Sequence, residues 1–359
     1  MNRVIFDDNA TTNPKFGSIP LDRSLDELLG SGILLVKKPR GPTSHQLTAW
    51  IRNVLGIKKI GHGGTLDPMA TGLLTILCGR ATRLTDIILK GDKRYISVIR
   101  FGRNIDSLEL ESLLASLVGE IYNVPPKESA VKVQVRTRTI SSLRLLDFDS
   151  ESRIAAIEIS CVAGTYIRTL TRDIGLLLNT SCEMLELHRD KTSIFDESMA
   201  CNMHQLVDAI FLWKEHNDER SLRKLLTPVE SILTKIPSIT IKDGAVAAMT
   251  HGAPLARPGV VNASSKITSG SLVVINSMKG EAGAVAEISV DIDEVSNMKK
   301  GQVAVEYVLL LIVASSFVMI VFERLNNVIS FDYQNCNDGV FNPVCAINDS
   351  IGFSPGQVS

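Results

Sequence analysis

The sequence lacks the features that mark zinc proteins, exported proteins and broadly basic nucleic-acid binders. Its six cysteines include no C-x-x-C pair, so the usual spacing of a zinc site is absent and we expect no metal. The formal net charge is −1, which is not the basic balance typical of a nucleic-acid binder. The first residues contain no apolar h-region, so we expect no signal peptide and a cytoplasmic location for the main part of the chain.

The chain is long and apolar enough to form more than one hydrophobic core. It has 359 residues, of which 45% are hydrophobic and 21% charged. Strand-like and helical stretches follow one another without a regular β-α-β alternation, so we predict an α+β fold with a mixed or antiparallel sheet. Residues 32–38 predict a strand, and a helix capped by Thr43 or Ser44 should end at Gly56. After Pro237, short strand-like runs between Gly-rich turns predict a small β-barrel.

One loop stands out between these elements. The segment Gly61-His62-Gly63-Gly64 is too rich in glycine for a helix or a central strand, and it suits a backbone that something approaches closely. Asp67 and Pro68 follow, and then comes an apolar run of strand length at 73–78. From this pattern alone, Asp67 is either the side chain of an Asx-turn or a catalytic acid presented on a loop, and the two readings are equally supported.

Five segments, taken in their order along the chain, resemble the TruB family of RNA pseudouridine synthases. The resemblance is best to the archaeal branch related to dyskerin, which also carries a PUA domain after the catalytic domain. Residues 241–259 resemble that PUA domain, and Thr12-Asn13-Pro14 resembles the N-terminal extension of the branch. The five segments are Lys38-Pro39-x-Gly-Pro-Thr-Ser-His45, Gly61-His62-Gly-Gly-Thr-Leu-Asp67-Pro68-x-Ala-Thr-Gly72, Lys93-x-Tyr95, Pro125-Pro126-x-x-Ser129-Ala130-Val131-Lys132 and Gly164-Thr-Tyr166-Ile-Arg168-x-Leu170.

The resemblance implies three catalytic residues and no cofactor. Asp67 matches the catalytic carboxylate of the family, which acts as a nucleophile or removes a sugar proton. Tyr95 matches an aromatic residue that stacks on the extruded base and helps to move the C5 proton. Arg168 matches the arginine that pairs with the catalytic carboxylate and aims it. Breaking and remaking the glycosidic bond needs neither a metal nor a redox cofactor.

The same resemblance implies a set of residues that contact the substrate. His62 matches a loop histidine beside the flipped nucleotide, and Leu187 matches an apolar residue of the pocket. The predicted substrate-binding and RNA-binding residues are His62, Gly63, Gly64, Thr65, Lys38, Leu187 and Arg189.

Two segments depart from the family pattern. Residues 188–195 read His-Arg-Asp-Lys-Thr-Ser-Ile-Phe, where the family has Arg-Arg-x-Arg-x-Gly-Pro-Phe, so a cation and a Gly-Pro pair are lost. Asn123-Val124 precedes the Pro-Pro pair, where the family usually has Gln. We expect both departures to weaken RNA contacts without affecting Asp67.

The resemblance also implies partners. Members of this branch act in a box H/ACA particle, where a guide RNA selects the uridine in rRNA and small partner proteins help to hold it. The PUA domain grips the guide by its shape and phosphates. The alternative is a stand-alone enzyme that acts on the tRNA T-loop.

The C-terminal part is of a different kind. Lys299-Lys300-Gly301 precedes an apolar run, and the pattern resembles an archaeal type IV pilin-like signal. Residues 303–322 are long enough to span a bilayer as a hydrophobic helix, which allows a membrane tether, a fused surface-filament subunit or a joined sequence. Residues 302–308 also suit the last strand of a PUA domain. The predicted domains are 1–31 (N-terminal extension), 32–235 (catalytic), 236–300 (PUA), 301–324 (possible transmembrane helix) and 325–359 (acidic tail).

Overall fold

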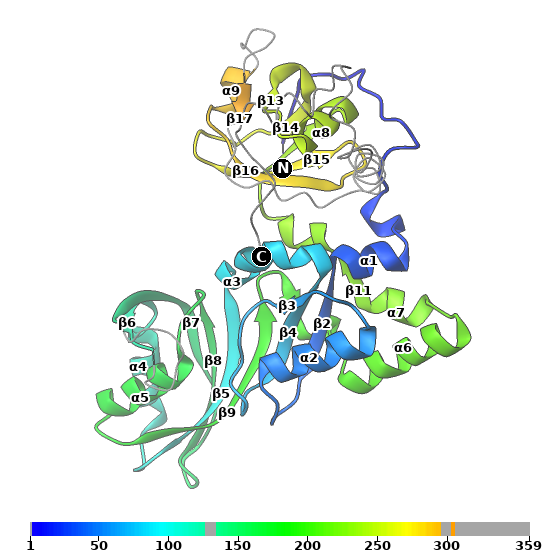
Figure 1. Cartoon of the computed structure of the whole chain (residues 1–359). Helices are drawn as coiled ribbons and strands as arrows, with labels where there is room; N and C mark the ends of the chain where they lie inside the picture. The colour runs from blue at the N-terminus through cyan, green and yellow to red at the C-terminus, as the bar shows by residue number, and fades with distance from the viewer. Residues whose placement is uncertain (1, 126–133, 296–302, 306–359) are drawn as a thin grey trace, which may run out of the picture.

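The computed structural model describes residues 2–125, 134–295 and, for the backbone alone, 303–305 (Figure 1). The helices are η1 (Pro20–Asp22), α1 (Leu25–Ser31), α2 (Ser44–Leu55), η2 (Gly79–Leu84), α3 (Thr85–Lys90), α4 (Ser107–Ser116), α5 (Ile167–Leu177), η3 (Glu197–Met199), α6 (Met203–His216), α7 (Arg220–Leu225), η4 (Val229–Leu233), α8 (Asp243–Thr250), η5 (Arg257–Gly259) and α9 (Ile292–Val295). The strands are β1 (Arg3–Ile5), β2 (Gly32–Lys38), β3 (Ile60–His62), β4 (Thr71–Cys78), β5 (Lys93–Phe101), β6 (Gly119–Asn123), β7 (Arg136–Asp149), β8 (Ile154–Cys161), β9 (Cys182–Thr192), β10 (Phe195–Asp196), β11 (Leu226–Pro228), β12 (Ser238–Ile241), β13 (Leu255–Ala256), β14 (Val260–Ser264), β15 (Leu272–Ser277), β16 (Ala282–Glu287) and β17 (Val303–Val305).

The large domain is built on one ten-stranded sheet in the order β11-β2-β4-β9-β5-β8-β7-β6, with β3 on β4 and β10 on β9. Its strand pairs are antiparallel except β4 with β9, which are parallel and paired only at Thr71↔His188 and Gly72↔Arg189. The predicted α+β class and mixed sheet are therefore confirmed. The short β4–β9 pairing joins two halves of the sheet, and the candidate site described below lies at this junction.

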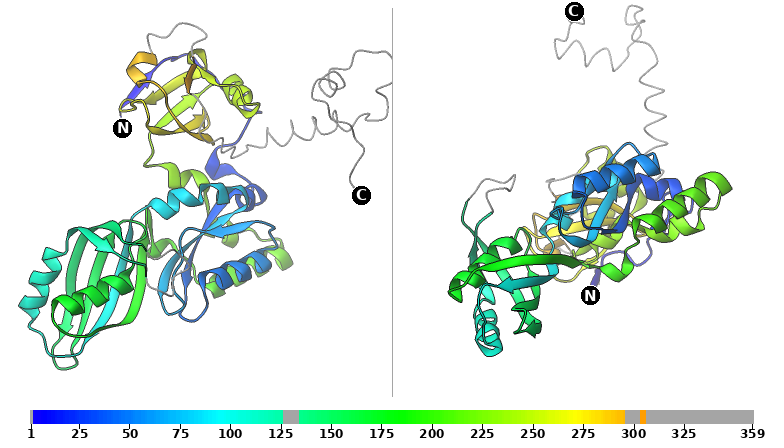
Figure 2. Two further views of the ribbon diagram at one scale, coloured as in Figure 1. Left: turned by 60° about the vertical axis from the view of Figure 1, so that its left-hand side comes forward. Right: turned by 90° about the horizontal axis from the view of Figure 1, so that it is seen from below.

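The residues of β2 show why this half of the sheet is buried on both faces. Leu34 and Val36 face a core formed with α1, α2, α6 and α7. Ile33 and Leu35 face the opposite core, formed with η2, α3 and η4. A strand covered on both sides needs a continuous apolar run rather than an alternating one, as β2 has. In the other half, α4 and α5 cover β5, β7 and β8 (Figures 1 and 2).

The helix predicted after the first strand is confirmed as α2, and of its two candidate caps Thr43 is the N-cap residue. The Thr43 hydroxyl accepts the Gln46 backbone N–H at 3.0 Å, and the Gln46 side chain accepts the Thr43 N–H at 2.8 Å. This reciprocal arrangement satisfies two amides that the first turn leaves without partners. Gly56 ends the helix in the left-handed region at φ 73°.

The small domain combines the segment after Pro237 with the first residues of the chain. The predicted β-barrel consists of a five-stranded sheet, β1-β14-β12-β15-β16, and a separate pair, β13 with β17. Strand β1 was not predicted, and it pairs antiparallel with β14 through Val4↔Ala263 (Figure 2). The start of the N-terminal extension thus belongs to the small domain, whereas α1 at its end packs in the core of the large domain.

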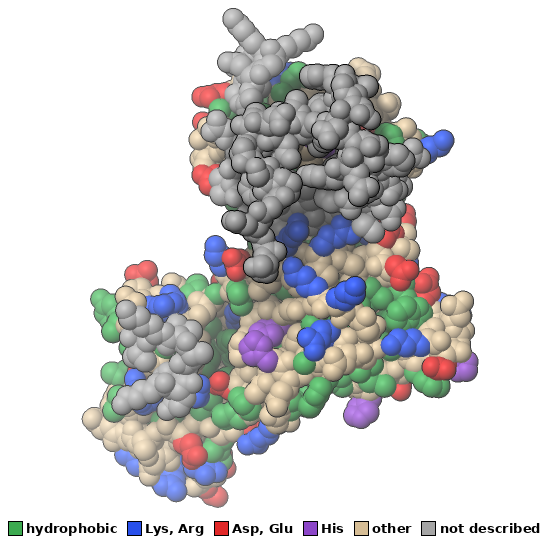
Figure 3. Space-filling view, in the orientation of Figure 1, with side chains coloured by type: hydrophobic (Ala, Val, Ile, Leu, Met, Phe, Trp, Pro, Cys, Tyr) green, Lys and Arg blue, Asp and Glu red, His purple; other side chains and the backbone are tan. Residues whose placement is uncertain are grey.

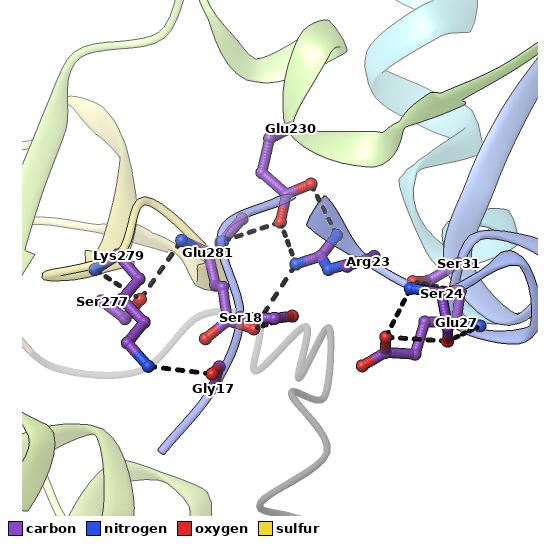
Figure 4. A network of polar contacts seen from close by, with 11 residues as sticks. Gly17, Ser18, Arg23, Ser24, Glu27, Ser31, Glu230, Ser277, Lys279 and Glu281 are labelled. Carbon is purple, nitrogen blue, oxygen red and sulfur yellow. Dashed lines mark hydrogen bonds and ion pairs between the residues drawn. The ribbon is translucent and has the colours of Figure 1, made fainter. Parts of the chain in front are cut away.

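A cluster of buried charges joins the extension, the large domain and the small domain (Figure 4). Arg23, which is nearly fully buried, forms two hydrogen bonds with Glu230, at 2.7 and 2.9 Å. Its guanidinium also lies 3.7 Å from Glu281 of the small domain. Lys279 donates to the carbonyl oxygen of Gly17 at 3.0 Å. One guanidinium is thus shared between two carboxylates at the domain junction.

We expect Glu281→Gln to stabilise the protein at pH 7. Burial and the nearby Glu230 charge raise the pKa of Glu281, although Arg23 and Lys279 oppose this. A carboxyl group with a raised pKa in the folded state adds stability below its unfolded pKa and loses it as the pH rises through the folded pKa. The gain from Gln should therefore shrink as the pH falls towards 4. Urea unfolding at pH 7 and pH 4 measures this, and an equal gain at both values would contradict it.

The predicted C-terminal helix needs a correction at its start. Val303–Val305 form strand β17, which pairs with Leu255–Ala256, rather than the beginning of a helix over 301–324. This supports the alternative prediction that residues 302–308 contain the last strand of the small domain. The β-branched valines suit a strand that meets a partner at this point. Within the residues that the structure describes, no helix is long and apolar enough to cross a bilayer. The acidic tail 325–359 and residues 306–324 lie outside the described residues, as does the segment 126–133.

Candidate active site

The loop that carries Asp67 runs between β3 and β4 and is held at several points. The Gly63 N–H donates to the Thr75 carbonyl oxygen at 2.8 Å. A methyl group on Gly63 would lie 2.4 Å from Ile88, so only glycine allows this close packing. Gly64 has φ 126°, a conformation that side chains rarely adopt. The glycines therefore let the loop pass close to its neighbours, as their composition predicted.

The two residues beside Asp67 are fixed by the segment 38–44. The Ser44 hydroxyl accepts the Leu66 N–H at 2.8 Å and donates to the Leu66 carbonyl oxygen at 3.1 Å. The Gly41 N–H donates to the Pro68 carbonyl oxygen at 2.8 Å. Sequence reasoning named Ser44 as a possible helix cap but not as a site residue, although it lies within a motif that suggested the family. The backbone of Asp67 is thus held on both sides.

Lys38 has a different role from the one predicted. Its ammonium group is buried and donates to the carbonyl oxygens of Pro39, Pro68 and Ala70 at 3.0, 3.2 and 2.7 Å. All three N–H bonds therefore have partners within the protein. Lys38 supports the Asp67 loop rather than contacting RNA, and burial lowers its pKa.

Asp67 pairs with Arg168 rather than forming an Asx-turn. Arg168 lies in the first turn of α5, and its Nε and Nη2 lie 3.0 and 3.3 Å from the two carboxylate oxygens of Asp67. The turn after Asp67 is closed by its main chain, because its carbonyl oxygen accepts the Ala70 N–H at 3.0 Å. Both side chains remain about one-third exposed. The carboxylate is therefore aimed by Arg168 and open to a ligand.

A cavity of about 480 Å³ opens beside this pair. It lies where β4 meets β9, close to β5 and the start of α5. Asp67 is the only acidic residue among the described residues that line it. The lining residues are Gly64, Thr65, Leu66, Asp67, Leu89, Lys93, Tyr95, Gly164, Thr165, Tyr166, Ile167, Arg168, Leu187 and Arg189.

Tyr95, Leu187 and Arg189 come together in this cavity from two paired strands. Tyr95 of β5 lies opposite Arg189 of β9 in the register. Burial raises the pKa of Tyr95, so its phenol stays protonated at neutral pH. Arg189 is 1% exposed and donates to the carbonyl oxygens of Leu73 and Gly64 at 2.9 and 3.1 Å. Arg189 therefore shapes the wall of the cavity.

Lys93 and Tyr166 also line the cavity and were not predicted as site residues. Lys93 is two residues before Tyr95, so the period of a strand puts both side chains on one face, and this spacing could have indicated it. Its ammonium group donates to the carbonyl oxygens of Ile88, Leu89 and Gly91 at 3.0, 2.7 and 2.5 Å. These acceptors stabilise the charged form, while burial and the Arg189 charge lower the pKa of Lys93 to about 8.

The loop residues predicted to contact substrate are only partly brought together. Gly64 and Thr65 line the cavity, whereas Gly63 packs beneath the loop and His62 is not among the described lining residues. His62 makes an edge-to-face contact with His45, with ring centroids 4.8 Å apart. Burial and the neighbouring His45 lower the pKa of His62 to about 4, so it is neutral at pH 7.

The lost Gly-Pro pair at 193–194 leaves a strained turn that can be tested. Ser193 begins the two-residue connection between β9 and β10, with φ 54°. Positive φ costs a non-glycine residue roughly 1–2 kcal/mol, whereas glycine costs about 0.5–1 kcal/mol in entropy. We expect Ser193→Gly to raise the free energy of unfolding by about 0.5–1 kcal/mol, measured by urea titration. Ser198→Gly, in the nearby η3 helix, should not stabilise the protein. A lower free energy of unfolding for Ser193→Gly would contradict the inference that Ser193 is strained.

Family models match nearly the whole described chain. Residues 52–167 match the TruB family pseudouridylate synthase N-terminal domain, and residues 168–234 match the tRNA pseudouridylate synthase B C-terminal domain. Residues 237–308 match the PUA domain, and residues 1–48 match the DKCLD (NUC011) domain. The PUA match includes β17.

Known proteins and solved structures are also similar to this chain over most of their length. A probable tRNA pseudouridine synthase B of Pyrobaculum calidifontis is 41% identical over 293 residues, covering 82% of this chain and 87% of that protein. Its counterpart in Methanocaldococcus jannaschii is 37% identical over 298 residues, covering 83% and 88%. A crystal structure of a Cbf5–Nop10–Gar1 complex matches with a TM-score of 0.79 and 36% identity, covering 87% of this chain and 94% of that one. An H/ACA RNP bound to a substrate RNA containing 2′-deoxyuridine matches with a TM-score of 0.79 and 34% identity, with the same coverage.

Proposed function

Since this chain belongs to the TruB family of pseudouridylate synthases and is an RNA pseudouridine synthase, we propose that Asp67, Tyr95 and Arg168 carry out its reaction. The observation that supports this assignment is the Asp67–Arg168 pair at the edge of the cavity. No other carboxylate lines the cavity among the described residues. The chemistry that needs one carboxylate is therefore assigned to Asp67.

The reaction breaks the bond between C1′ and N1 of uridine, turns the uracil and joins C1′ to C5. N1 gains a proton, and C5 loses one. Asp67 serves in one of two ways, by attacking C1′ or by removing a sugar proton, and it is regenerated in both. Arg168 holds the carboxylate in position. Tyr95, as a neutral phenol, lies against the extruded base and provides a hydroxyl for transfer of the C5 proton.

We further propose that the chain works as the catalytic subunit of a box H/ACA particle. The similar structures named above contain Nop10, Gar1 and an H/ACA RNA–protein assembly. Lys and Arg side chains gather on the large domain near the small domain, which suits contact with a nucleic-acid backbone there (Figure 3). The PUA domain then holds the guide RNA, and small partner proteins help to place the target uridine.

The alternative is a stand-alone tRNA enzyme, because the similar archaeal proteins are named as tRNA pseudouridine synthases. Tritium release from C5-labelled uridine distinguishes the two. We expect an rRNA fragment to react only when a complementary guide RNA and the partner proteins are added, and a guide with a scrambled target sequence serves as the control. Equal turnover of tRNA alone, with no gain from guide and partners, would contradict the guide-dependent role.

The proposed membrane tether through 303–322 is a separate matter. Strand β17 and the PUA match to residue 308 favour assigning residues 303–308 to the PUA domain. A tether or a cleaved pilin-like tail would then involve only residues beyond 308. Membrane fractionation together with intact-mass measurement tests it, and a full-length chain in the soluble fraction would contradict both forms.

A further inference from the structure

Asn123, one of the departures from the family pattern, is buried rather than free to contact RNA. It ends the edge strand β6 and is 1% exposed. Its Oδ1 accepts the Tyr166 N–H at 2.8 Å, and its Nδ2 donates to the Tyr166 carbonyl oxygen at 3.3 Å. One side-chain amide therefore holds both polar groups of a single peptide residue. The expectation that this position weakens RNA contacts is replaced by a role inside the protein.

Tyr166 is the residue from which helix α5 begins. It stands at the N-cap but provides no side-chain cap, since its hydroxyl cannot reach the first amides of the helix as a serine would. A second tie is made one turn later, where the Thr169 hydroxyl donates to the Val124 carbonyl oxygen at 2.7 Å. The end of β6 thus fixes the first turn of α5 from the side, at residues 166 and 169.

Arg168 lies between these two ties. Its guanidinium reaches both oxygens of Asp67 at the edge of the cavity, at 3.0 and 3.3 Å. The segment before the helix turns at Gly164, with φ 75°, where Arg138 donates to the Gly164 carbonyl oxygen at 3.1 Å and Thr165 to that of Val162 at 2.8 Å. Neither of these bonds acts on residues 166–169, which are tied by Asn123 and Val124. A shift of about 1 Å in a catalytic group can reduce a rate by about 100-fold. The direction of Arg168 therefore depends on how firmly the start of α5 is held.

We propose that Asn123 is a positioning residue for the isomerisation: it clamps Tyr166 so that Arg168 aims the Asp67 carboxylate. This inference rests on the proposed roles of Asp67 and Arg168. Asn123 acts through Arg168 and does not touch the substrate. Its effect should consequently appear in turnover and depend on the presence of Arg168.

The test compares the full-length chain with Asn123→Ala, Arg168→Ala and the double variant, by tritium release from the RNA on which the wild type is active. We expect Asn123→Ala to lower kcat by about 10- to 100-fold, with KM and RNA affinity changed by less than about twofold. In the Arg168→Ala background, Asn123→Ala should lower kcat by less than a further factor of about two, because the effect that Asn123 exerts through Arg168 is already lost. Glu120→Ala, on the exposed side of the same strand, is the matched control and should be unchanged.

Folding is checked by thermal melting and by circular dichroism of each variant. If Asn123→Ala does not fold, Thr169→Val removes the second tie while keeping the side-chain shape, and it should show a smaller loss of the same kind. Asn123→Gln, which retains the amide on a longer side chain, should recover part of kcat. Equal losses with and without Arg168, or a loss in RNA affinity instead of kcat, would overturn the inference alone. If the wild-type chain is active and Asp67→Ala is still active, the proposed function is overturned as well.

Discussion

Replacing Asp67 by alanine or asparagine is expected to abolish pseudouridine formation, lowering kcat by about four orders of magnitude or more. Asp67 is the only carboxylate among the described residues of the cavity, so no neighbour can take over its attack or its proton transfer. The loop should keep its shape, because Ser44 holds Leu66 and Gly41 holds Pro68 through the main chain. Tritium release from C5-labelled uridine in RNA measures the loss.

RNA binding should survive the same substitution. Asp67 contributes a negative charge, which does not favour contact with phosphates, so affinity should stay within about threefold. Asp86→Asn, on the exposed side of the nearby helix α3, is the matched control and should retain full activity. Turnover by Asp67→Asn at more than a trace level would rule out the assignment of the carboxylate.

Lys38→Met is expected to destabilise the protein strongly, by about 3–5 kcal/mol in the free energy of unfolding. Methionine fills a similar volume but removes the ammonium donor from the carbonyl oxygens of Pro39 and Ala70, whereas the Pro68 carbonyl oxygen keeps the Gly41 N–H. Each unsatisfied buried acceptor costs about 1–3 kcal/mol, and release of the buried charge offsets part of the sum. Urea unfolding measures the loss.

The same variant should also lose turnover, because two of the three carbonyl groups belong to Pro68 and Ala70, directly after Asp67. Lys37→Met, at the one exposed residue of strand β2, provides the control and should change stability by less than about 0.5 kcal/mol. A normal unfolding curve for Lys38→Met, together with weaker RNA binding, would favour the original expectation that Lys38 contacts RNA.

Much of the site was predictable because its signals are local. The spacing of Gly61-His62-Gly63-Gly64 and Asp67 indicated a loop that allows close approach, and the structure shows Gly63 packed tightly on Ile88. The order of Asp67, Tyr95 and Arg168 along the chain indicated the family, and these three side chains line one cavity. The N-terminal cap of helix α2 and the end of strand β2 were also predictable, because each depends on residues that lie close together in the sequence.

The predictions that failed depend on residues far apart in the sequence. Lys38 was predicted from the family resemblance to contact substrate or RNA, but Pro68 and Ala70, some 30 residues away, accept hydrogen bonds from its ammonium group. Asn123 was interpreted as a departure from the family that weakens RNA contacts, but it is buried against Tyr166. Burial is decided by which segments pack together, and no local pattern records that.

By itself, the sequence determined the α+β class, the family and the carboxylate on the glycine-rich loop, because backbone preferences and motif spacing act over short distances. The tertiary structure alone decided which polar side chains face the substrate and which support the loop. It also decided that the first strand of the chain pairs with the small domain, and that residues 303–305 complete a strand pair there. These outcomes depend on long-range packing and on where each buried donor finds its acceptor.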